Sequence, residues 1–393
     1  CALPILKSIK TSFVSCRLMT NESADKNYLP ALTGIRAIAA WMVFIHHFNP
    51  LGTSENHHIK LSWAPELIFR MLNEFHVGVT IFFVLSGFLI CFRYYDNFHF
   101  TGAWFRKYLK NRVARIYPMY FLLTLLTFFL IPVLLPEESI QCTWAILALN
   151  ISFLRGFFQT TVFTLIGQGW SLTVEECFYF SAPLIFFIAK RFNLFIQVIA
   201  ITLTGVLFVL AAPTINFYGF MNSYHFMWVY TFFGRCFEFF CGIQLALWIK
   251  NGKTWSANLN YTYTGLFSFV LVLGCIAMQR PDDKFLGIDA ASGVFLNNYI
   301  LPLCITMIFY GLITEASIIK KILSTNFFEA MGKSSYIFYL IHMGVIEVII
   351  SRYISSNLIV VFIILNVLCY LLFRFIEDPL NKAIRRSAFL IKG

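Results

Sequence analysis

Long apolar runs recur along almost the whole 393-residue sequence and limit the chain to one kind of fold. A helix that crosses a bilayer needs about 20 mostly apolar residues. Ten runs of suitable length are predicted to be spans: 35–52, 76–95, 113–135, 172–189, 194–212, 229–249, 262–278, 291–313, 334–352 and 357–377. A shorter run at 144–154 is interpreted as interfacial or re-entrant. The predicted fold is all-α, a polytopic integral membrane helical bundle with about ten transmembrane helices.

The composition supports a membrane protein and argues against other classes. Hydrophobic residues make up 59% and charged residues 12% of the chain, whereas soluble domains contain about 45–50% apolar and about 25% charged residues. A soluble globule, a disordered chain, a collagen-like repeat and a disulfide-rich secreted scaffold are therefore excluded. Most of the ten cysteines fall within or beside apolar runs. No metal-type Cys/His spacing occurs, so we expect no metal site.

The net charge of +11 is interpreted as a topology signal and not as a sign of nucleic-acid binding. With the N-terminus inside, 23 Lys and Arg residues fall in inner segments and six in outer segments. Excess Lys and Arg marks cytoplasmic loops, so we predict cytoplasmic N- and C-termini and a multi-pass protein of the cell inner (cytoplasmic) membrane. No cleavable signal peptide is expected.

One membrane domain is predicted over residues 28–386. An N-terminal polar extension, 1–27, precedes it, and within this extension residues 1–18 are interpreted as an upstream addition. A short tail, 387–393, follows the domain.

Ionisable side chains within the predicted spans are the candidates for function, because such groups are costly in lipid and usually face the bundle interior or a cavity. They are Arg36, His46, His47, Glu175, Glu176, Arg235, Glu238, His342 and Glu347.

Arg36 and His47 are eleven residues apart. That spacing turns a helix by about 1100°, or about 20° past three full turns, and separates the residues by about 16 Å along the axis. The two side chains therefore share a helix face, with Arg36 near the cytoplasmic end and His47 deeper. The alternative is that His47 is a hydrogen-bonded core histidine.

Arg112 and Arg115 form an RxxR pair in a basic segment. A spacing of three places both guanidinium groups on one side of a helix start, where they could grip a phosphate. The alternative is topology and headgroup anchoring at the inner face.

Further polar groups occur in three places. Glu175 follows Trp170 and Ser171 at the outer end of a span, where a carboxylate could orient an imidazole or receive a proton; the alternative is an aromatic belt with a capping acid. Arg235 and Glu238 are most simply interpreted as neutralising each other. A third group lies on one helical face and forms either a polar cavity wall or an interhelical cluster: Ser335, Tyr339 and His342.

Seven segments together resemble the acyltransferase-3 family of integral membrane O-acyltransferases, in order and over residues 28–386. They are 28–48 (YLPALTGIRAIAAWMVFIHHF), 77–90 (VGVTIFFVLSGFLI), 112–121 (RVARIYPMYF), 170–183 (WSLTVEECFYFSAP), 234–246 (GRCFEFFCGIQLA), 331–342 (MGKSSYIFYLIH) and 375–382 (FIEDPLNK). Two positions depart from the family pattern, because Thr33 stands where Asp is common and Asp378 where a basic residue is common.

The resemblance implies transfer of an acyl group, usually acetyl. The donor would be acetyl-CoA or another acyl-CoA, used as a co-substrate on the cytoplasmic side, with no permanently bound cofactor. The acceptor would be a hydroxyl of an extracytoplasmic glycan, lipid-linked saccharide or related envelope molecule such as lipopolysaccharide. The expected partners are thus the donor, the acceptor and membrane lipids, and no nucleic acid.

The resemblance also assigns residues. The R-x10-H motif falls on Arg36 and His47, and the RxxR motif, associated with acyl-CoA, falls on Arg112 and Arg115. The remaining motifs fall on Ser86, Gly87, Trp170, Ser171, Glu175, Ser335, Tyr336, Tyr339 and His342.

The chemistry implied is base-assisted acyl transfer. We predict that His47 deprotonates the acceptor hydroxyl or first accepts the acyl group itself, while Glu175 or another polar neighbour orients its ring. Arg112 and Arg115 would hold the CoA phosphates, and Arg36 would extend the positive path inward. The alternatives are a proton-coupled transporter of a small solute and a structural scaffold. In the transporter, the proton path would run through His47, Glu175, Arg235 and Glu238.

Overall fold

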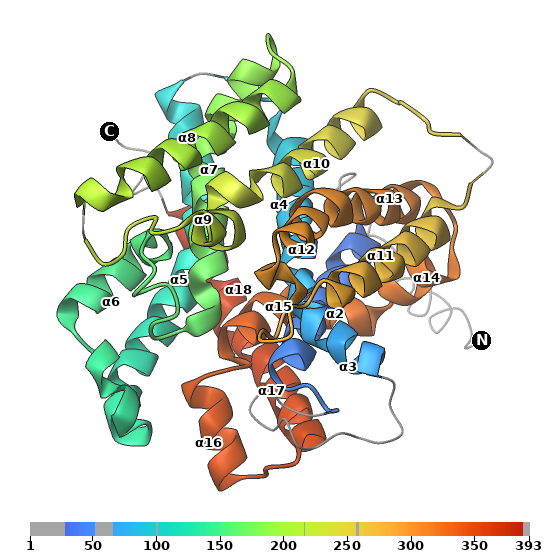
Figure 1. Cartoon of the computed structure of the whole chain (residues 1–393). Coiled ribbons are helices and arrows are strands. Elements are labelled where there is room, and N and C mark those ends of the chain that lie inside the picture. The colour runs from blue at the N-terminus through green and yellow to red at the C-terminus, as the bar shows by residue number, and fades with distance from the viewer. Residues whose placement is uncertain (1–27, 52–65, 100, 216, 257–258, 388–393) are drawn as a thin grey trace, which may run out of the picture.

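The structure, a computed structural model, describes residues 28–51, 66–99, 101–215, 217–256 and 259–387. Within these residues every named element is a helix, and strand-like pairing is limited to one isolated bridge between Phe158 and Phe220. The all-α prediction is therefore confirmed (Figure 1). The predicted extension 1–27 and residues 388–393 of the predicted tail lie outside the described residues.

Helices long and apolar enough to cross a membrane make up most of the described chain. Eight unbroken stretches qualify: Glu66–Tyr94, Gly102–Leu134, Gly167–Ala189, Leu194–Ile215, Tyr224–Lys250, Tyr261–Met278, Ala291–Thr314 and Leu358–Arg386. A ninth is the pair Asn326–Ile341 (α15) and Val345–Tyr353 (α16), which meet at 88°. Among the described residues the count is thus eight or nine, against ten predicted spans. The tenth predicted span, 35–52, falls on α2 (Pro30–His47). This helix carries an arginine and two histidines and is not among the stretches apolar enough to qualify.

α2 lies in the interior of the bundle and packs closely on α15 and on α4 (Gly78–Tyr94). A Cβ on Gly332 of α15 would lie 1.9 Å from the carbonyl oxygen of Thr33 in α2. Only glycine lets the two backbones approach this closely. The helix that carries Arg36 and His47 is therefore held tightly against α15.

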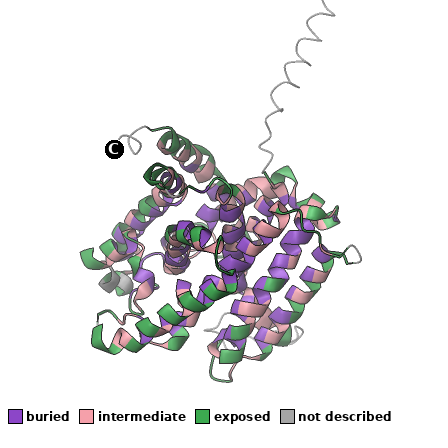
Figure 2. Cartoon of the chain, turned by 90° about the horizontal axis from the view of Figure 1, so that it is seen from above, coloured by how far each residue is buried: buried purple, intermediate pink, exposed green. Residues whose placement is uncertain are grey.

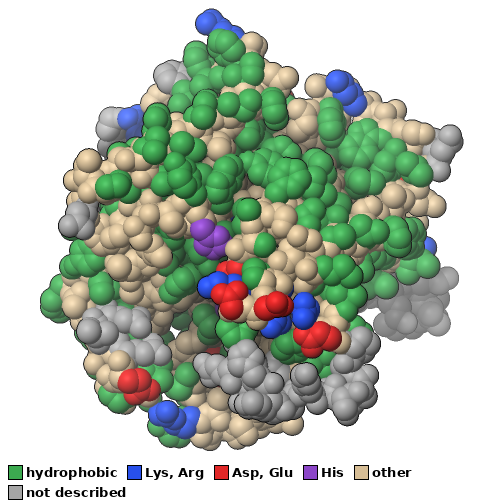
Figure 3. Space-filling view, in the orientation of Figure 1, with side chains coloured by type: hydrophobic (Ala, Val, Ile, Leu, Met, Phe, Trp, Pro, Cys, Tyr) green, Lys and Arg blue, Asp and Glu red, His purple; other side chains and the backbone are tan. Residues whose placement is uncertain are grey.

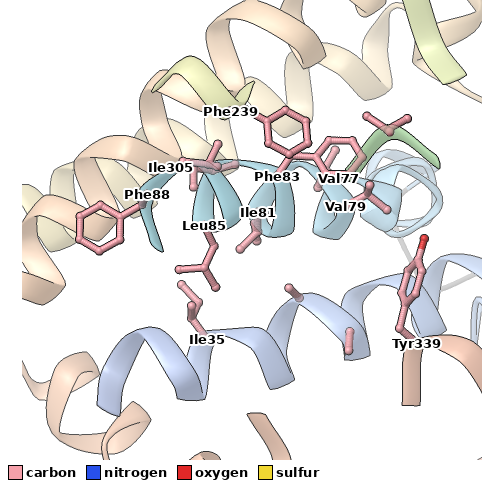
Figure 4. Close-up of a cluster of buried hydrophobic side chains, with 14 of the residues drawn as sticks. Ile35, Val77, Val79, Ile81, Phe83, Leu85, Phe88, Phe239, Ile305 and Tyr339 are labelled. Carbon is pink, nitrogen blue, oxygen red and sulfur yellow. The ribbon is translucent and has the colours of Figure 1, made fainter. Parts of the chain in front are cut away.

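α4 lies between α2 and α10 (Phe232–Lys250), as Figure 4 shows for the side chains of Ile35 on one side and Phe239 on the other. A Cβ on Gly87 would lie 2.1 Å from the carbonyl oxygen of Phe239, so this contact also requires glycine. Gly87 therefore faces α10, which leaves its neighbour Ser86 to line the cavity described below.

The peripheral helices turn exposed positions outward (Figure 2), and many of these positions are apolar. In α8 (Leu194–Ile215), Leu203 and Leu207 are 56% and 63% exposed and lie one turn apart. α17 (Leu358–Leu372) exposes Ile359 and Ile363 in the same way. Figure 3 shows one face of the molecule on which hydrophobic side chains dominate and charged side chains gather in a few groups. Such a surface is suited to lipid and supports a membrane protein.

α5 (Gly102–Leu134) is longer than a bilayer requires. Its 33 residues extend about 50 Å, whereas the hydrocarbon core is about 30 Å thick. The helix begins eleven residues before the predicted span 113–135, so Arg112 and Arg115 lie well inside a helix and not at its start. α18 (Asp378–Arg386) packs against α5.

The break between α15 and α16 is held by a neighbouring segment. Gly344 has φ of +107°, a conformation that L side chains rarely adopt. The Gln168 side-chain amide donates to the carbonyl oxygens of Leu340 at 2.7 Å and Met343 at 3.2 Å. The start of α7 (Trp170–Ala189) is thereby fastened to the end of α15.

The remaining α-helices are shorter or lie away from the site. α6, with eight residues, is too short to cross a bilayer, and Figure 1 places it at the margin of the bundle. The bounds of these remaining helices are α3 (Glu66–Asn73), α6 (Trp144–Ile151), α9 (Tyr224–Tyr230), α11 (Tyr261–Met278), α12 (Ala291–Phe295), α13 (Leu301–Thr314) and α14 (Ile318–Leu323).

Candidate active site

A cavity of about 520 Å³ opens among α2, α4, α5, α7, α15 and α18. Its charged lining residues are Arg36, Arg93, Arg112, Arg115, Glu175, Lys333, Asp378, Lys382 and Arg385. Seven of these nine are cations, which favours an anionic occupant. The structure thereby brings together seven of the candidate residues: Arg36, Ser86, Arg112, Arg115, Ser171, Glu175 and Tyr339.

The open end of the cavity is marked by three arginines from three helices, Arg93, Arg112 and Arg385, which we call the arginine mouth. Arg93 and Arg385 are exposed. Arg112 donates a hydrogen bond to the Tyr94 hydroxyl at 3.4 Å, and its guanidinium carbon lies 5.5 Å and 5.7 Å from the ring centres of Tyr94 and Tyr179. These aromatic faces orient the guanidinium at the cavity wall.

Arg115 is engaged differently from Arg112. It forms a hydrogen-bonded ion pair with Glu377, a carboxylate that is only 2% exposed, and its guanidinium lies 5.9 Å from the ring centre of Tyr336. Sequence reasoning considered Asp378 and missed Glu377. The available signal was an acidic residue at the end of an apolar run, where an ionic partner is expected.

The middle of the cavity holds a carboxylate in a hydrogen-bonded setting. Ser86 Oγ donates to Glu175 at 2.7 Å, and the Tyr179 hydroxyl donates to the same carboxylate at 3.3 Å. Arg36 lines this part of the cavity and lies within electrostatic range of Glu175. The N-cap of α7 is Gly169, with no side-chain capping bond, so Glu175 faces the cavity and does not cap the helix.

Two hydroxyl groups lie at the inner end of the cavity. Ser171 Oγ and the Tyr339 hydroxyl are 2.8 Å apart, and Tyr339 also donates to the Gln168 carbonyl oxygen at 2.9 Å. In Figure 4 the Tyr339 ring points toward the first turns of α4, near Val79. Each hydroxyl carries one proton, so in this arrangement Ser171 donates to Tyr339. A rotation of the Ser171 Oγ–H would let it donate instead to an oxygen that develops negative charge in the cavity.

A cluster of four imidazole rings lies beyond this inner end. The ring of His342 is 5.8 Å from that of Tyr339 and 5.3 Å from that of His47, measured between ring centres. His46 is 4.7 Å from His47 and 5.4 Å from His76. Sequence reasoning missed His76, because its position near the start of a predicted span gave no indication that it faces another histidine.

His342 has a defined tautomer. Its Nδ1 lies 2.8 Å from the Tyr339 carbonyl oxygen, which only accepts hydrogen bonds, so Nδ1 carries the proton. In the neutral ring Nε2 is then an acceptor. This nitrogen is buried and has no hydrogen-bond partner among the described residues.

His46 makes its hydrogen bond away from the contact between His47 and His342. Its Nδ1 donates to the Asn73 carbonyl oxygen, and Asn73 in turn accepts a hydrogen bond from the Asn49 side chain at 2.7 Å. The predicted distinction between His47 and His46 therefore corresponds to different surroundings, because His47 lies next to His342.

A model of the acyltransferase-3 family, described as an acyltransferase domain, matches residues 29–376. The chain belongs to this family. The predicted resemblance is thereby confirmed, and every lining residue described above except those of α18 falls within the matched region or at its edge.

Curated relatives of this acyltransferase-3 protein include the O-acetyltransferase OatA of Staphylococcus aureus strain NCTC 8325 / PS 47 and that of strain MW2. Each is 26% identical over 398 residues, covering 93% of this chain and 59% of the relative. The chain thus spans about three-fifths of the length of these relatives. No solved structure matches it significantly.

Some candidate residues of this acyltransferase-3 protein lie apart from one another. Glu175 is bonded to Ser86 and Tyr179, whereas the ring neighbours of His47 are His46 and His342. His342, and not Glu175, is therefore the polar side chain next to the His47 ring on the side away from His46.

The remaining candidates make contacts within the bundle. Arg235 and Glu238 form a buried ion pair, as interpreted, and Arg235 also donates to Thr80 Oγ1 at 3.0 Å. Its guanidinium lies 6.0 Å from the ring centre of Trp170, so the pair supports the start of α7. Ser335 donates to its own helix, at the Gly332 carbonyl, 2.8 Å away.

Arg155 is another functional candidate that sequence reasoning missed, since it was counted as an outer-segment cation. It is fully buried and donates to Asn150 Oδ1 at 2.6 Å and to the Ile166 carbonyl at 2.5 Å. A Cβ on Gly169 would lie 2.2 Å from its guanidinium. Burial lowers the pKa of Arg155 from its ordinary value, yet the guanidinium remains a donor that fixes the segment leading into Trp170.

No group of three His, Cys, Asp or Glu side chains in the described part of the chain could hold a metal ion. The histidine cluster makes ring contacts and backbone hydrogen bonds, and His76 Nδ1 also lies 3.6 Å from the Glu74 carboxylate.

Proposed function

We propose that this chain is a membrane O-acyltransferase that moves an acyl group, typically acetyl, from acyl-CoA at the cytoplasmic face to a hydroxyl of an extracytoplasmic glycan or envelope molecule. Membership of the acyltransferase-3 family supports acyl transfer. Relatives named O-acetyltransferase support acetyl as the group and a hydroxyl as the acceptor.

One observation carries the proposal. A single cavity leads from three arginines at its mouth, past Arg36 and Glu175, to the hydroxyls of Ser171 and Tyr339, with the histidine cluster beyond. Its volume of about 520 Å³ is within the range of small-molecule sites. A donor with phosphates at one end and a thioester at the other matches this polarity.

The donor side of the cavity is proposed to be cytoplasmic. The predicted topology assigns Arg93, Arg112 and Arg385 to inner segments, and Lys and Arg are concentrated there. Arg36, Arg112 and Arg115 would contribute positive potential along the path of the donor. The acceptor would then approach His47 from the opposite side, beyond Ser171 and Tyr339.

The proposed reaction needs one imidazole, which takes up a proton and later returns it. His47 takes the proton of the acceptor hydroxyl as its oxygen attacks the thioester carbonyl carbon, and the C–O bond forms. The Ser171 hydroxyl, turned from Tyr339 toward the substrate, stabilises the negative oxygen of the tetrahedral intermediate. The C–S bond then breaks, and the imidazolium returns the proton to the thiolate sulfur, which yields the ester and CoA. In a two-step variant, His47 itself carries the acyl group between donor and acceptor.

His342 is proposed to orient His47. Its Nε2 lone pair has a fixed direction because Nδ1–H is bonded to the Tyr339 carbonyl. Accepting a hydrogen bond from one nitrogen of His47 would leave the other nitrogen free to act as the base. Glu175 instead supports the wall of the cavity together with Ser86 and Tyr179.

The test is label transfer by the purified full-length chain in proteoliposomes, with acetyl-labelled acetyl-CoA outside and extracted envelope glycans inside. We expect labelled ester on the glycans, which mild alkali releases as acetate. The control is a vesicle without protein. If label enters the vesicles but remains soluble and unattached, the chain is a transporter and the proposal is wrong.

A further inference from the structure

α18 turns one face toward the cavity. Asp378, Asn381, Lys382 and Arg385 all line it, at the spacing i, i+3, i+4 and i+7 that places residues on one side of a helix. Arg386, the next residue along, is exposed and is not part of the lining. The helix is therefore a wall of the cavity and not only a surface anchor.

Both ends of α18 are fastened to α5. At the start, Glu377 is ion-paired with Arg115. At the end, the buried side chain of Lys110 donates a hydrogen bond to the carbonyl oxygen of Ser387. These two ties hold Arg385 at a set place next to Arg112, since both anchoring residues belong to the helix that carries Arg112.

The cations around the mouth fall into two groups. Arg115, Lys333 and Lys382 each have a carboxylate partner within 4.0 Å, namely Glu377, Glu329 and Asp378. Arg93, Arg112 and Arg385 make no such ion pair within the described residues. The second group is the arginine mouth.

The members of the arginine mouth lie close enough to affect one another. Arg385 is within electrostatic range of both Arg93 and Arg112, and all three line the same cavity. Like charges gathered at a low-dielectric wall raise the local potential and attract an anion. Arginines from three helices also supply the planar forks that phosphate oxygens accept.

We infer that Arg93, Arg112 and Arg385 form a phosphomonoester site at the mouth. Through Arg385, α18 makes the protein selective for a donor that carries a 3′-phosphate on its nucleotide in addition to its pyrophosphate. This rests on the proposed function, in which the thioester lies at the inner end. The group farthest from the thioester of acetyl-CoA is the nucleotide with its 3′-phosphate. Arg93 and Arg385 at the mouth are exposed, whereas Ser171 and Tyr339 are buried, so the mouth is the outer end of the cavity. Arg115 is then a positioning residue that holds α18 through Glu377.

One of the three arginines of this site lies beyond the family match. The family model ends at residue 376, whereas Arg385 and the rest of the lining face of α18 follow it. Recognition of the pantetheine arm and pyrophosphate would fall to the matched helices alone, whereas recognition of the 3′-phosphate would need Arg385 of α18 in addition to Arg93 and Arg112.

The test is calorimetric binding of acetyl-CoA and of acetyl-dephospho-CoA, which lacks the 3′-phosphate. It uses the full chain in phosphatidylcholine nanodiscs, which have no net charge. We expect the wild type to prefer acetyl-CoA by about 10- to 100-fold, the size of one charge-assisted contact. Arg385→Gln should lose most of that preference while binding acetyl-dephospho-CoA as the wild type does. The matched control, Arg386→Gln, should keep it.

Three results separate the explanations. If Arg385→Gln keeps the wild-type preference, the inference is wrong although the proposed function stands. If the wild type binds neither compound, the proposed function itself fails. A lipid headgroup is the other source of phosphate. If phosphatidylglycerol in the nanodisc displaces acetyl-CoA from the wild type but not from Arg385→Gln, the site binds a lipid headgroup and the assignment to the donor is overturned.

Discussion

The mouth of the cavity and the histidine cluster beyond its inner end, here called the histidine end, are built on different physical principles. The arginine mouth gathers cations that are exposed or half-buried and supplies attraction that depends little on exact angles. The histidine end holds His47 and His342 in a cluster where His342 is fully buried and bonded to a backbone carbonyl. Binding an anion tolerates some freedom of position, whereas proton transfer needs a lone pair in a defined direction. Substitutions at the two ends should therefore change different kinetic constants.

The largest effect is expected at the histidine end. His47→Ala removes the proposed base, so kcat for acetyl transfer should fall by about 10²- to 10⁴-fold. The measurement is label transfer at matched protein abundance. His46→Ala is the control, because His46 is bonded to the Asn73 carbonyl and lies on the other side of the cluster. Equal activity of wild type and His47→Ala would reject the base assignment.

A different constant should respond at the arginine mouth. Arg112→Gln keeps a polar side chain but removes its charge, so KM for acetyl-CoA should rise by about 10- to 100-fold, with kcat within about threefold of wild type. Added salt should weaken donor binding to the wild type more than to the variant, because screening acts on the lost charge. A fall in kcat at unchanged KM would contradict the separation of the two ends.

His342→Asn tests the positioning role and should have an intermediate effect. Asparagine is smaller than histidine and cannot present the same directed lone pair toward His47, so kcat should fall by about tenfold while KM for acetyl-CoA stays unchanged. Steady-state kinetics with saturating acceptor would measure both. The kcat-against-pH profile should also change, since His342 adjoins the proposed base. An altered KM with normal kcat and an unchanged profile would assign His342 to packing alone.

The smallest effect is expected for a cation that already has a partner. Lys382 lines the mouth but is 63% exposed and paired with Asp378 at 2.6 Å. A surface pair of this kind contributes about 0–1 kcal/mol, so Lys382→Gln should change KM by less than about fivefold. A loss as large as that of Arg112→Gln would show that the paired and unpaired cations do not differ in their contribution to binding.

The sequence was most informative where a feature depends on spacing within one helix. Arg36 and His47 do lie on one continuous helix, since α2 runs from Pro30 to His47. Ser86 and Gly87 likewise divide between the cavity and the contact with α10, as adjacent positions on a helix must. These relations follow from helical geometry and need no knowledge of the partners.

Contacts between distant segments could not be predicted in this way. Glu377 meets Arg115 across 262 positions, and Arg385 resembles any basic residue of an inner segment until α18 is placed against α5. Arg155 was counted as an outer cation, although the loop that precedes Trp170 wraps around it. The residue next to His47 could not be predicted either, because the position of His342 depends on where α15 ends.

The interruption between α15 and α16 has a consequence for the chemistry of its last residues. A helix that ended later would use the Tyr339 carbonyl for its own ladder, as the last four carbonyls of a helix are the ones left over. Ending at Ile341 releases that oxygen, and the His342 Nδ1–H takes it. The bend thus fixes the tautomer of His342. In a straight helix the Tyr339 carbonyl would be taken by the backbone, and the proton of the imidazole could then lie on either ring nitrogen.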